Sequence, residues 1–213
     1  MGPVMAASEV FQVRITGKGG HGALPHLAVD PLLAAAHIVT ALQSIAARNI
    51  NPLQSAVVSV TSIHAGETFN VIPPSVEMSG TIRTFEKEAR QIVIDRFRQI
   101  VAGVAESLGC AAEIEVTTLT PAVVNDPRLA EMVSNQASRS YPGCQVDSRF
   151  RTMVSEDMAY MMQTAPGCFF FVGSANPARG LDAPHHHPRF DVDEEALTLG
   201  AGLMSALITS LLN

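Results

Sequence analysis

The sequence predicts an α+β fold, and two observations support that prediction. Between residues 8 and 119, short runs alternate apolar and polar residues, as half-buried strands do, and two longer runs repeat apolar residues at helical spacing. After Pro121 the alternation gives way to uninterrupted apolar runs. We therefore expect one compact domain over 8–119 and part of a second domain over 120–213.

The first predicted elements are a strand, a helix and a strand. EVFQVRIT alternates apolar and polar residues, and the glycine-rich stretch GKGGHGALPH follows it as a loop. A helix is expected to begin at Pro31, because Asp30 is a favourable N-cap and proline suits the first helical position, and to run to about Arg48. SAVVSVTSI then predicts the next strand.

The same domain continues with a strand, a helix and a strand. SVEMSGTIRTF alternates, with Arg83 on its polar face. A helical period from Glu86 to Leu108 ends at Gly109, as glycine after a helix favours, and AEIEVTTL alternates again. This order is that of a ferredoxin-like βαββαβ domain, so we expect a four-stranded antiparallel sheet with two helices on one face.

The second region is predicted to be α/β. A helix is expected over 127–140, a short strand after YPGCQVD, and a helix in SEDMAYMMQ with Ser155 as its N-cap. CFFFVG is typical of a strand buried on both faces, and a helix is expected over 194–212. About two strands are fewer than a doubly wound sheet requires, which indicates part of a domain.

Composition excludes several classes of function. The net charge is −6 and no basic patch occurs, so no nucleic-acid partner is expected. The three cysteines form no CxxC pair, which suits a reducing compartment. The longest apolar run is interrupted by Gly, Ser and Thr, and the first residues lack a signal-peptide pattern, so we expect a cytoplasmic protein without a membrane span.

Several polar residues are candidates for a site, each with an ordinary alternative. DAPHHHPRFDVDE contains three consecutive histidines after an expected buried strand, where ligands of open α/β sheets bind, but tandem histidines also occur in exposed loops. A catalytic metal site needs about three protein ligands. By residue type alone, His21 suits a loop, Asn70 a turn and Arg83 a solvated strand.

Taken together and in order, GKGGHGALPH, FNVIPPSVEMSGTIRTF, SEDMAYMM and HHHPRFDVDEE resemble the M20 metallopeptidase family. The resemblance is greatest to its amidohydrolase subfamily, the hippurate hydrolase-like and N-acyl-amino-acid amidohydrolases. It implies a ferredoxin-like lid or dimerisation domain at 8–119 and the C-terminal part of an α/β zinc-peptidase-type catalytic domain at 120–213. It also implies a homodimer that cleaves the amide bond of aromatic or aliphatic N-acyl amino acids with two divalent metal ions, Zn or Mn, per complete site.

The resemblance assigns roles to individual residues. His21 matches the lid histidine that polarises the scissile carbonyl, commonly in the partner subunit's site. Asn70 and Arg83 match the residues that bind the substrate's carbonyl and carboxylate, and a guanidinium suits a carboxylate. His186, two residues before Pro188, matches the metal ligand, while its two neighbours, His185 and His187, are expected not to coordinate.

Other parts of the family's site do not match. Glu156 and Asp157 are implied to support the site, but the family's Cys-Gly-His-Asp segment and its Glu-Glu pair, which includes the general base, do not occur in their expected positions. The chain therefore resembles the C-terminal portion of such an enzyme, and we expect it to be inactive alone. The alternative is a non-catalytic dimerisation or binding module derived from an M20 peptidase.

Overall fold

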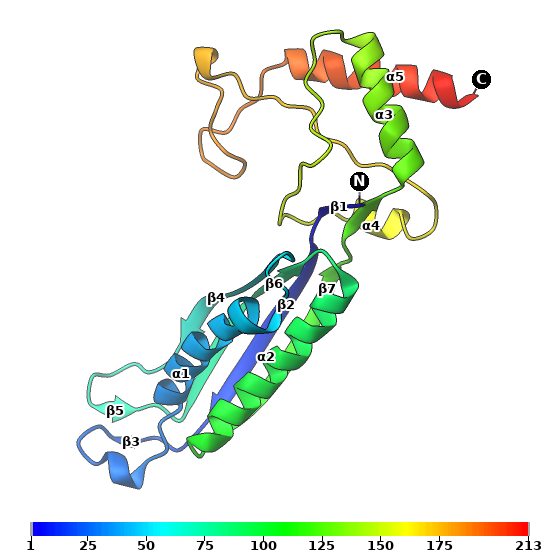
Figure 1. The fold of residues 1–213 in the computed structure, drawn as a ribbon. Helices are drawn as coiled ribbons and strands as arrows, with labels where there is room; N and C mark the ends of the chain where they lie inside the picture. The colour runs from blue at the N-terminus through cyan, green and yellow to red at the C-terminus, as the bar shows by residue number, and fades with distance from the viewer. Residues whose placement is uncertain (1, 213) are drawn as a thin grey trace. The chain divides into compact units, whose positions relative to one another are not determined.

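The computed structural model describes residues 2–212, which form two compact units (Figure 1). The sheet unit consists of residues 3–123 together with 151–163. The helix unit consists of residue 2, 124–150 and 164–212. The segment 151–163 therefore packs with the first unit, although in sequence it lies between two parts of the second.

The sheet unit contains the predicted ferredoxin-like fold. Its four-stranded antiparallel sheet has the order β4-β6-β2-β7, from strands β2 (Ala7–Thr16), β4 (Ala56–His64), β6 (Ser75–Thr84) and β7 (Ala111–Thr120). Helices α1 (Pro31–Ser44) and α2 (Lys87–Ser107) cover one face of this sheet (Figure 1). The prediction of four antiparallel strands with two helices on one face is confirmed.

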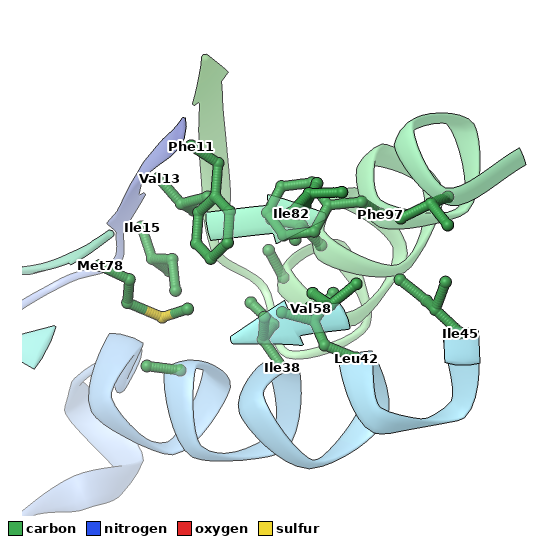
Figure 2. Close-up of a cluster of buried hydrophobic side chains, with 14 of the residues drawn as sticks. Phe11, Val13, Ile15, Ile38, Leu42, Ile45, Val58, Met78, Ile82 and Phe97 are labelled. Atoms are coloured by element: carbon green, nitrogen blue, oxygen red, sulfur yellow. The ribbon is translucent and has the colours of Figure 1, made fainter. Parts of the chain in front are cut away.

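The core of the sheet unit lies between the sheet and the two helices (Figure 2). Phe11 of β2 and Phe97 of α2 are fully buried, with ring centroids 4.5 Å apart. Gly80 of β6 is required here, because a Cβ at that position would lie 2.4 Å from the Phe11 ring and 2.0 Å from the Ser59 carbonyl oxygen. The aromatic pair and the glycine beneath it therefore hold the helix layer close to the sheet.

The predicted helix ends are present. The Asp30 carboxylate accepts hydrogen bonds from the backbone N–H groups of Leu32 (2.8 Å) and Leu33 (3.3 Å), so it caps α1 as expected. After Ser44 the helix widens into a π-helical turn, η2 (Ile45–Asn49). At the end of α2, Gly109 has a φ of +76° and its N–H donates to the Glu106 carbonyl.

The short elements of the sheet unit lie beyond the main sheet. They are β3 (Gly20–His21), η1 (Pro25–Leu27), β5 (Val71–Ile72) and α4 (Met158–Met161), together with residues 3–5 of β1 (Gly2–Met5) and the first residue of β8 (Val123–Asn125). Strands β3 and β5 pair with each other in a separate two-stranded ladder. This ladder brings the glycine-rich loop against the segment that precedes β6.

The helix unit is built on two long helices. Helix α3 (Pro127–Ser140) has the predicted bounds and is capped by Asp126, which accepts from the N–H groups of Arg128 and Leu129. Helix α5 (Glu195–Leu212) packs against it through a small buried cluster of Ala137, Leu203 and Leu207. A short 3-10 helix, η3 (Pro177–Arg179), lies in the connection between them.

Two strands predicted in the second region are not present among the described residues. Residues 168–173, the CFFFVG run, belong to no sheet, and Phe171 is 47% exposed. Their backbone is held instead by the Asn125 side chain, which donates to the Phe169 carbonyl and accepts from the Phe169 N–H. The prediction was wrong because a strand needs neighbouring strands to pair with, and residues 2–212 provide none here. The short strand after YPGCQVD is absent as well.

The helix predicted in SEDMAYMMQ is shorter than expected. It comprises only Met158–Met161, and Asp157 occupies its N-cap position without a side-chain cap. Ser155 was predicted to be the cap, and that prediction was wrong. The Ser155 hydroxyl instead accepts a hydrogen bond from Arg83, from which it is separated by 72 residues in sequence.

Candidate functional site

His21 and Asn70 are brought together by the β3–β5 ladder. His21 pairs with Val71, and the Gly22 N–H donates to the Asn70 carbonyl at 2.8 Å. The glycines of GKGGHG permit this approach, because a Cβ at Gly19 would lie 2.9 Å from the Ile72 carbonyl oxygen. Both candidate side chains are exposed. They form a corner at one end of the sheet unit, which we call the histidine corner (residues 19–27 and 69–72).

A local hydrogen bond selects the tautomer of His21. The backbone N–H of Ala23 donates to His21 Nδ1 at 3.0 Å, so this nitrogen carries a lone pair. In the neutral ring the proton is therefore on Nε2, which becomes the hydrogen-bond donor of the side chain. A neutral imidazole with an Nε2–H donor suits the polarisation of a carbonyl oxygen.

The histidine corner also exposes large apolar side chains. Phe69 is fully exposed, Leu27 is 59% exposed, and Leu24 and Val71 are each about half exposed. Single exposed apolar residues are ordinary. A group of them around two candidate functional side chains is typical of a surface that binds another protein or a ligand.

Arg83 lies near the end of β6, on the face of the sheet that the helices leave uncovered. Its Nε–H donates to Thr81 Oγ1 at 3.0 Å, and its Nη1 donates to Ser155 Oγ at 2.8 Å. The side chain is half-buried. Among residues 2–212 no carboxylate lies within ion-pair distance of this guanidinium; the ion pairs engage Arg14, Arg90, Arg128 and Arg179 instead.

The histidine corner and Arg83 lie at opposite ends of β6. The strand begins at Ser75, directly after the corner, and Arg83 is eight residues further along it. At a rise of about 3.3 Å per residue, this separates the two by roughly 25 Å. One chain therefore brings His21 and Asn70 together but keeps both away from Arg83. Figure 1 shows the β3–β5 ladder at one end of the four-stranded sheet.

The three consecutive histidines differ in their local geometry. His186 has a φ of +68°, and it is the one non-glycine residue with positive φ among residues 2–212. Such a conformation is strained and persists where the surroundings require it, often at functional sites. His187 accepts a hydrogen bond at Nδ1 from the Arg189 N–H, and the His185 ring lies against those of His186 and Phe190.

Asp193 closes the loop that contains the histidines. Its carboxylate accepts hydrogen bonds from the Asn176 side chain, from Arg179 Nη1 (2.9 Å) and from the Glu195 N–H (3.2 Å), and its own N–H donates to the Ser174 carbonyl. The Asn176 bond, followed by the Glu195 N–H, holds the pKa of Asp193 below its ordinary value. The ionised carboxylate therefore ties 174–176 to 193–195.

The described residues do not complete a metal site. No group of three or more His, Cys, Asp or Glu side chains within 2–212 is arranged to hold an ion. Glu156 and Asp157 interact locally, since Glu156 Oε1 accepts from the Asp157 N–H. Within these residues fewer than three such side chains can therefore bind one divalent cation, whereas a catalytic site needs about three protein ligands.

Sequence patterns alone had missed the two hydroxyl partners of Arg83. Thr81 was detectable, because residues two apart on a strand share a face and its side chain therefore lies beside Arg83. Ser155 had no such signal, since its helical context suggested a different role.

The geometry is that of a ferredoxin-like domain with the histidine corner at one end of its sheet. Residues 10–108 match the family profile described as the peptidase dimerisation domain. The chain belongs to the M20 family of metallopeptidases and amidohydrolases.

Individual relatives support this assignment. The chain is 40% identical to N-acetylcysteine deacetylase of Bacillus subtilis over 97% of its own length and 52% of the relative's. It is 37% identical to IAA-amino acid hydrolase ILR1-like 4 of Arabidopsis thaliana, over 98% and 48%. Among solved structures, the YXEP protein of Bacillus subtilis, a dinuclear metal-binding peptidase of the M20 family, is similar with a TM-score of 0.73, 35% identity, and coverage of 97% and 50%. The chain spans about half the length of the curated relatives it matches.

Proposed function

We propose that the chain acts in a metal-dependent amidohydrolase that cleaves the amide bond of N-acyl amino acids, and that it works as a homodimer with sites shared between subunits. The observation that carries this proposal is the separation of His21 and Asn70 from Arg83 along β6. The names of two relatives, N-acetylcysteine deacetylase and IAA-amino acid hydrolase, support N-acyl amino acids as the substrate class.

The shared site follows from the size of the substrate. In an N-acyl amino acid, the amide carbonyl and the carboxylate are separated by about one residue, roughly 3.5 Å of chain. His21 and Arg83 of one subunit, about 25 Å apart along the strand, are too distant to bind these two groups of the same molecule. In our proposal Arg83 therefore binds the carboxylate in one site, while His21 and Asn70 serve the carbonyl in the partner's site.

Each residue then has a definite task. His21 donates from Nε2 to the carbonyl oxygen as negative charge develops on it, and this charge stabilisation is the largest contribution the chain makes to the reaction. Asn70 adds a second polar group beside it. The exposed apolar side chains of the histidine corner, Phe69 above all, would lose their contact with water when the corner enters the partner's site.

The metal requirement extends beyond the described residues. A divalent cation in such a site activates the attacking water. We assign His186 the role of one ligand, on its position before Pro188 and its strained backbone, and assign no complete site to residues 2–212.

Two inactive variants test the shared site when they are mixed. His21→Ala and Arg83→Ala are made as two separate variants of the complete gene product. The two variants are co-expressed, and the mixture is assayed with divalent metal on an N-acetyl amino acid. If the site is shared, each mixed dimer contains one intact site, and a random mixture recovers about a quarter of wild-type activity, because half of the dimers are mixed. If all groups act within one subunit, the mixture stays as inactive as the separate variants, and the proposal is wrong.

Dimerisation itself is tested on the chain alone. The sheet has two edge strands, β4 and β7, and edges of this kind favour pairing with another strand. We expect light scattering to give the mass of a dimer, twice 22.6 kDa, at high protein concentration. A strict monomer under these conditions would contradict the homodimer.

A second candidate, a non-catalytic dimerisation module, is favoured by the incomplete set of metal ligands within 2–212. Turnover of N-acyl amino acids by the complete gene product with zinc or manganese would exclude it. Dimer formation without turnover would support it.

A further inference from the structure

Arg83 differs from Arg90, another arginine near its end of the sheet, in how its charge is compensated. Arg90 of α2 forms an ion pair with Glu9, which is fully buried, and also donates to Thr118 Oγ1. The charge of Arg90 is thus compensated within the chain. Arg83 contacts two neutral hydroxyls and no carboxylate among the described residues, so its charge remains available for an anion.

The hydroxyl of Thr81 is itself oriented. Thr81 Oγ1 donates to the Glu9 carbonyl at 3.0 Å, which directs its proton away from Arg83. Its lone pairs are therefore free to accept from Arg83 Nε, and they do so at 3.0 Å. The guanidinium is anchored through this chain of two hydrogen bonds to the backbone of β2.

The hydroxyl of Ser155 comes from a segment that is also held in place. The N–H of Ala6 donates to the Val154 carbonyl at 3.1 Å, and the N–H of Thr152 donates to the Val4 carbonyl at 3.0 Å. These bonds tie 152–154 to the chain around the start of β2, and Ser155 follows directly. Ser155 Oγ then accepts from Arg83 Nη1 at 2.8 Å.

We propose that Ser155 is a positioning residue that, together with Thr81, orients the Arg83 guanidinium toward the carboxylate of the substrate. Arginine has five N–H donors in a rigid fork, and the two hydroxyls occupy one at Nε and one at Nη1. The donors that remain are at Nη1 and Nη2, so a carboxylate is bound from that end. This inference rests on the proposed function, in which Arg83 binds that carboxylate.

The first test compares two substrates that differ only in the charge that Arg83 would bind. The complete gene product is assayed on an N-acetyl amino acid and on its C-terminal carboxamide. In Ser155→Ala we expect the KM for the acid to rise about tenfold, as the loss of a hydrogen bond to a charged group does, while kcat for the acid and the KM for the carboxamide stay unchanged. Ser155→Thr, which keeps the hydroxyl, should restore most of the loss.

The control lies on the same strand and face as Arg83. Ser79→Ala removes a hydroxyl from β6 without touching the guanidinium, and it should leave both KM values unchanged. If Ser155→Ala raises the KM for both substrates equally, or for neither, the positioning role is overturned.

The second test is independent of turnover. In the chain of 213 residues, the Arg83 Nε–H resonance is recorded by NMR and assigned by its loss in Arg83→Lys. We expect Ser155→Ala to shift it and speed its exchange with water, while Ser155→Thr and Ser79→Ala leave it close to wild type. An unchanged resonance in Ser155→Ala overturns the inference. If the resonance responds but no N-acyl amino acid is hydrolysed, the positioning of Arg83 stands and the proposed function fails.

Discussion

The two units of the chain differ in how completely they bury their own apolar residues. In the sheet unit, α1, α2 and all four strands contribute to one core, and Phe11, Ile38, Ile82 and Phe97 are fully buried. In the helix unit the corresponding buried cluster has three members, and α5 leaves Leu197 65% and Leu211 59% exposed. Folding of the sheet unit is therefore driven by its own core, while the helix unit has apolar surface that residues 2–212 do not cover.

Helix α5 shows this most clearly. By length and composition it is the one helix among the described residues that would suffice to cross a membrane, yet Leu203 and Leu207 pack against α3 and the helix contains Gly, Ser and Thr. An exposed apolar face of this kind marks a surface that another element, another protein or a membrane can cover, and length and composition alone are weak evidence for a membrane span.

The largest effect should come from the core of the sheet unit. Phe97→Ala is expected to lower the free energy of unfolding by about 3–5 kcal/mol, because it leaves a cavity beneath Phe11. Phe171→Ala in the helix unit is the matched control: that ring is 47% exposed, so we expect a much smaller loss. Urea unfolding of both variants measures the difference, and equal losses would remove the distinction between the units.

Next in size are the residues of the histidine corner, whose loss should affect activity without affecting stability. His21→Ala is expected to reduce turnover of the complete gene product by about a hundredfold, as removal of an oxyanion donor does. Its melting temperature should match wild type, since His21 is exposed and its ring makes one hydrogen bond within the described residues, at Nδ1. Normal turnover in this variant would show that the role assigned to His21 is wrong.

Hydrogen exchange should then separate the two units at the level of single segments. Amides of β2 and β6 lie inside the sheet and should exchange slowly, whereas those of 170–173, which pair with no strand, should exchange early. Limited proteolysis should likewise leave 8–119 intact longer than 121–213. Equal rates of digestion would contradict a self-sufficient sheet unit.

The smallest effect concerns the pH dependence of the histidine loop. Because hydrogen bonds hold the pKa of Asp193 below its ordinary value, the ionised carboxylate stabilises the folded loop at pH values above the unfolded pKa, and this contribution is lost as the pH falls through the lower folded pKa. The protection of the 174–195 amides, measured relative to the intrinsic exchange rate at each pH, should therefore fall only under acidic conditions. Asp193→Asn should weaken this protection at neutral pH, while Asp182→Asn, at an exposed position, should not.

The architecture of the sheet unit and the ends of its helices could be predicted from the amino-acid sequence alone. Alternation in β2 and β6, the Asp30–Pro31 start of α1 and Gly109 at the end of α2 are local signals, each complete within a few residues. Local signals of this kind predict the structure correctly where the elements they specify also bury apolar residues in a core. The four motifs likewise identified the family without any coordinates.

Features that depend on residues far apart in sequence became visible only in the tertiary structure. The apolar run at 168–173 forms no strand, because strand formation requires a partner and not only an apolar sequence. Ser155 does not cap its helix, because its hydroxyl is used by Arg83, 72 residues away. The distance between His21 and Arg83 likewise depends on the direction and length of β6 after the corner, which the motifs do not specify.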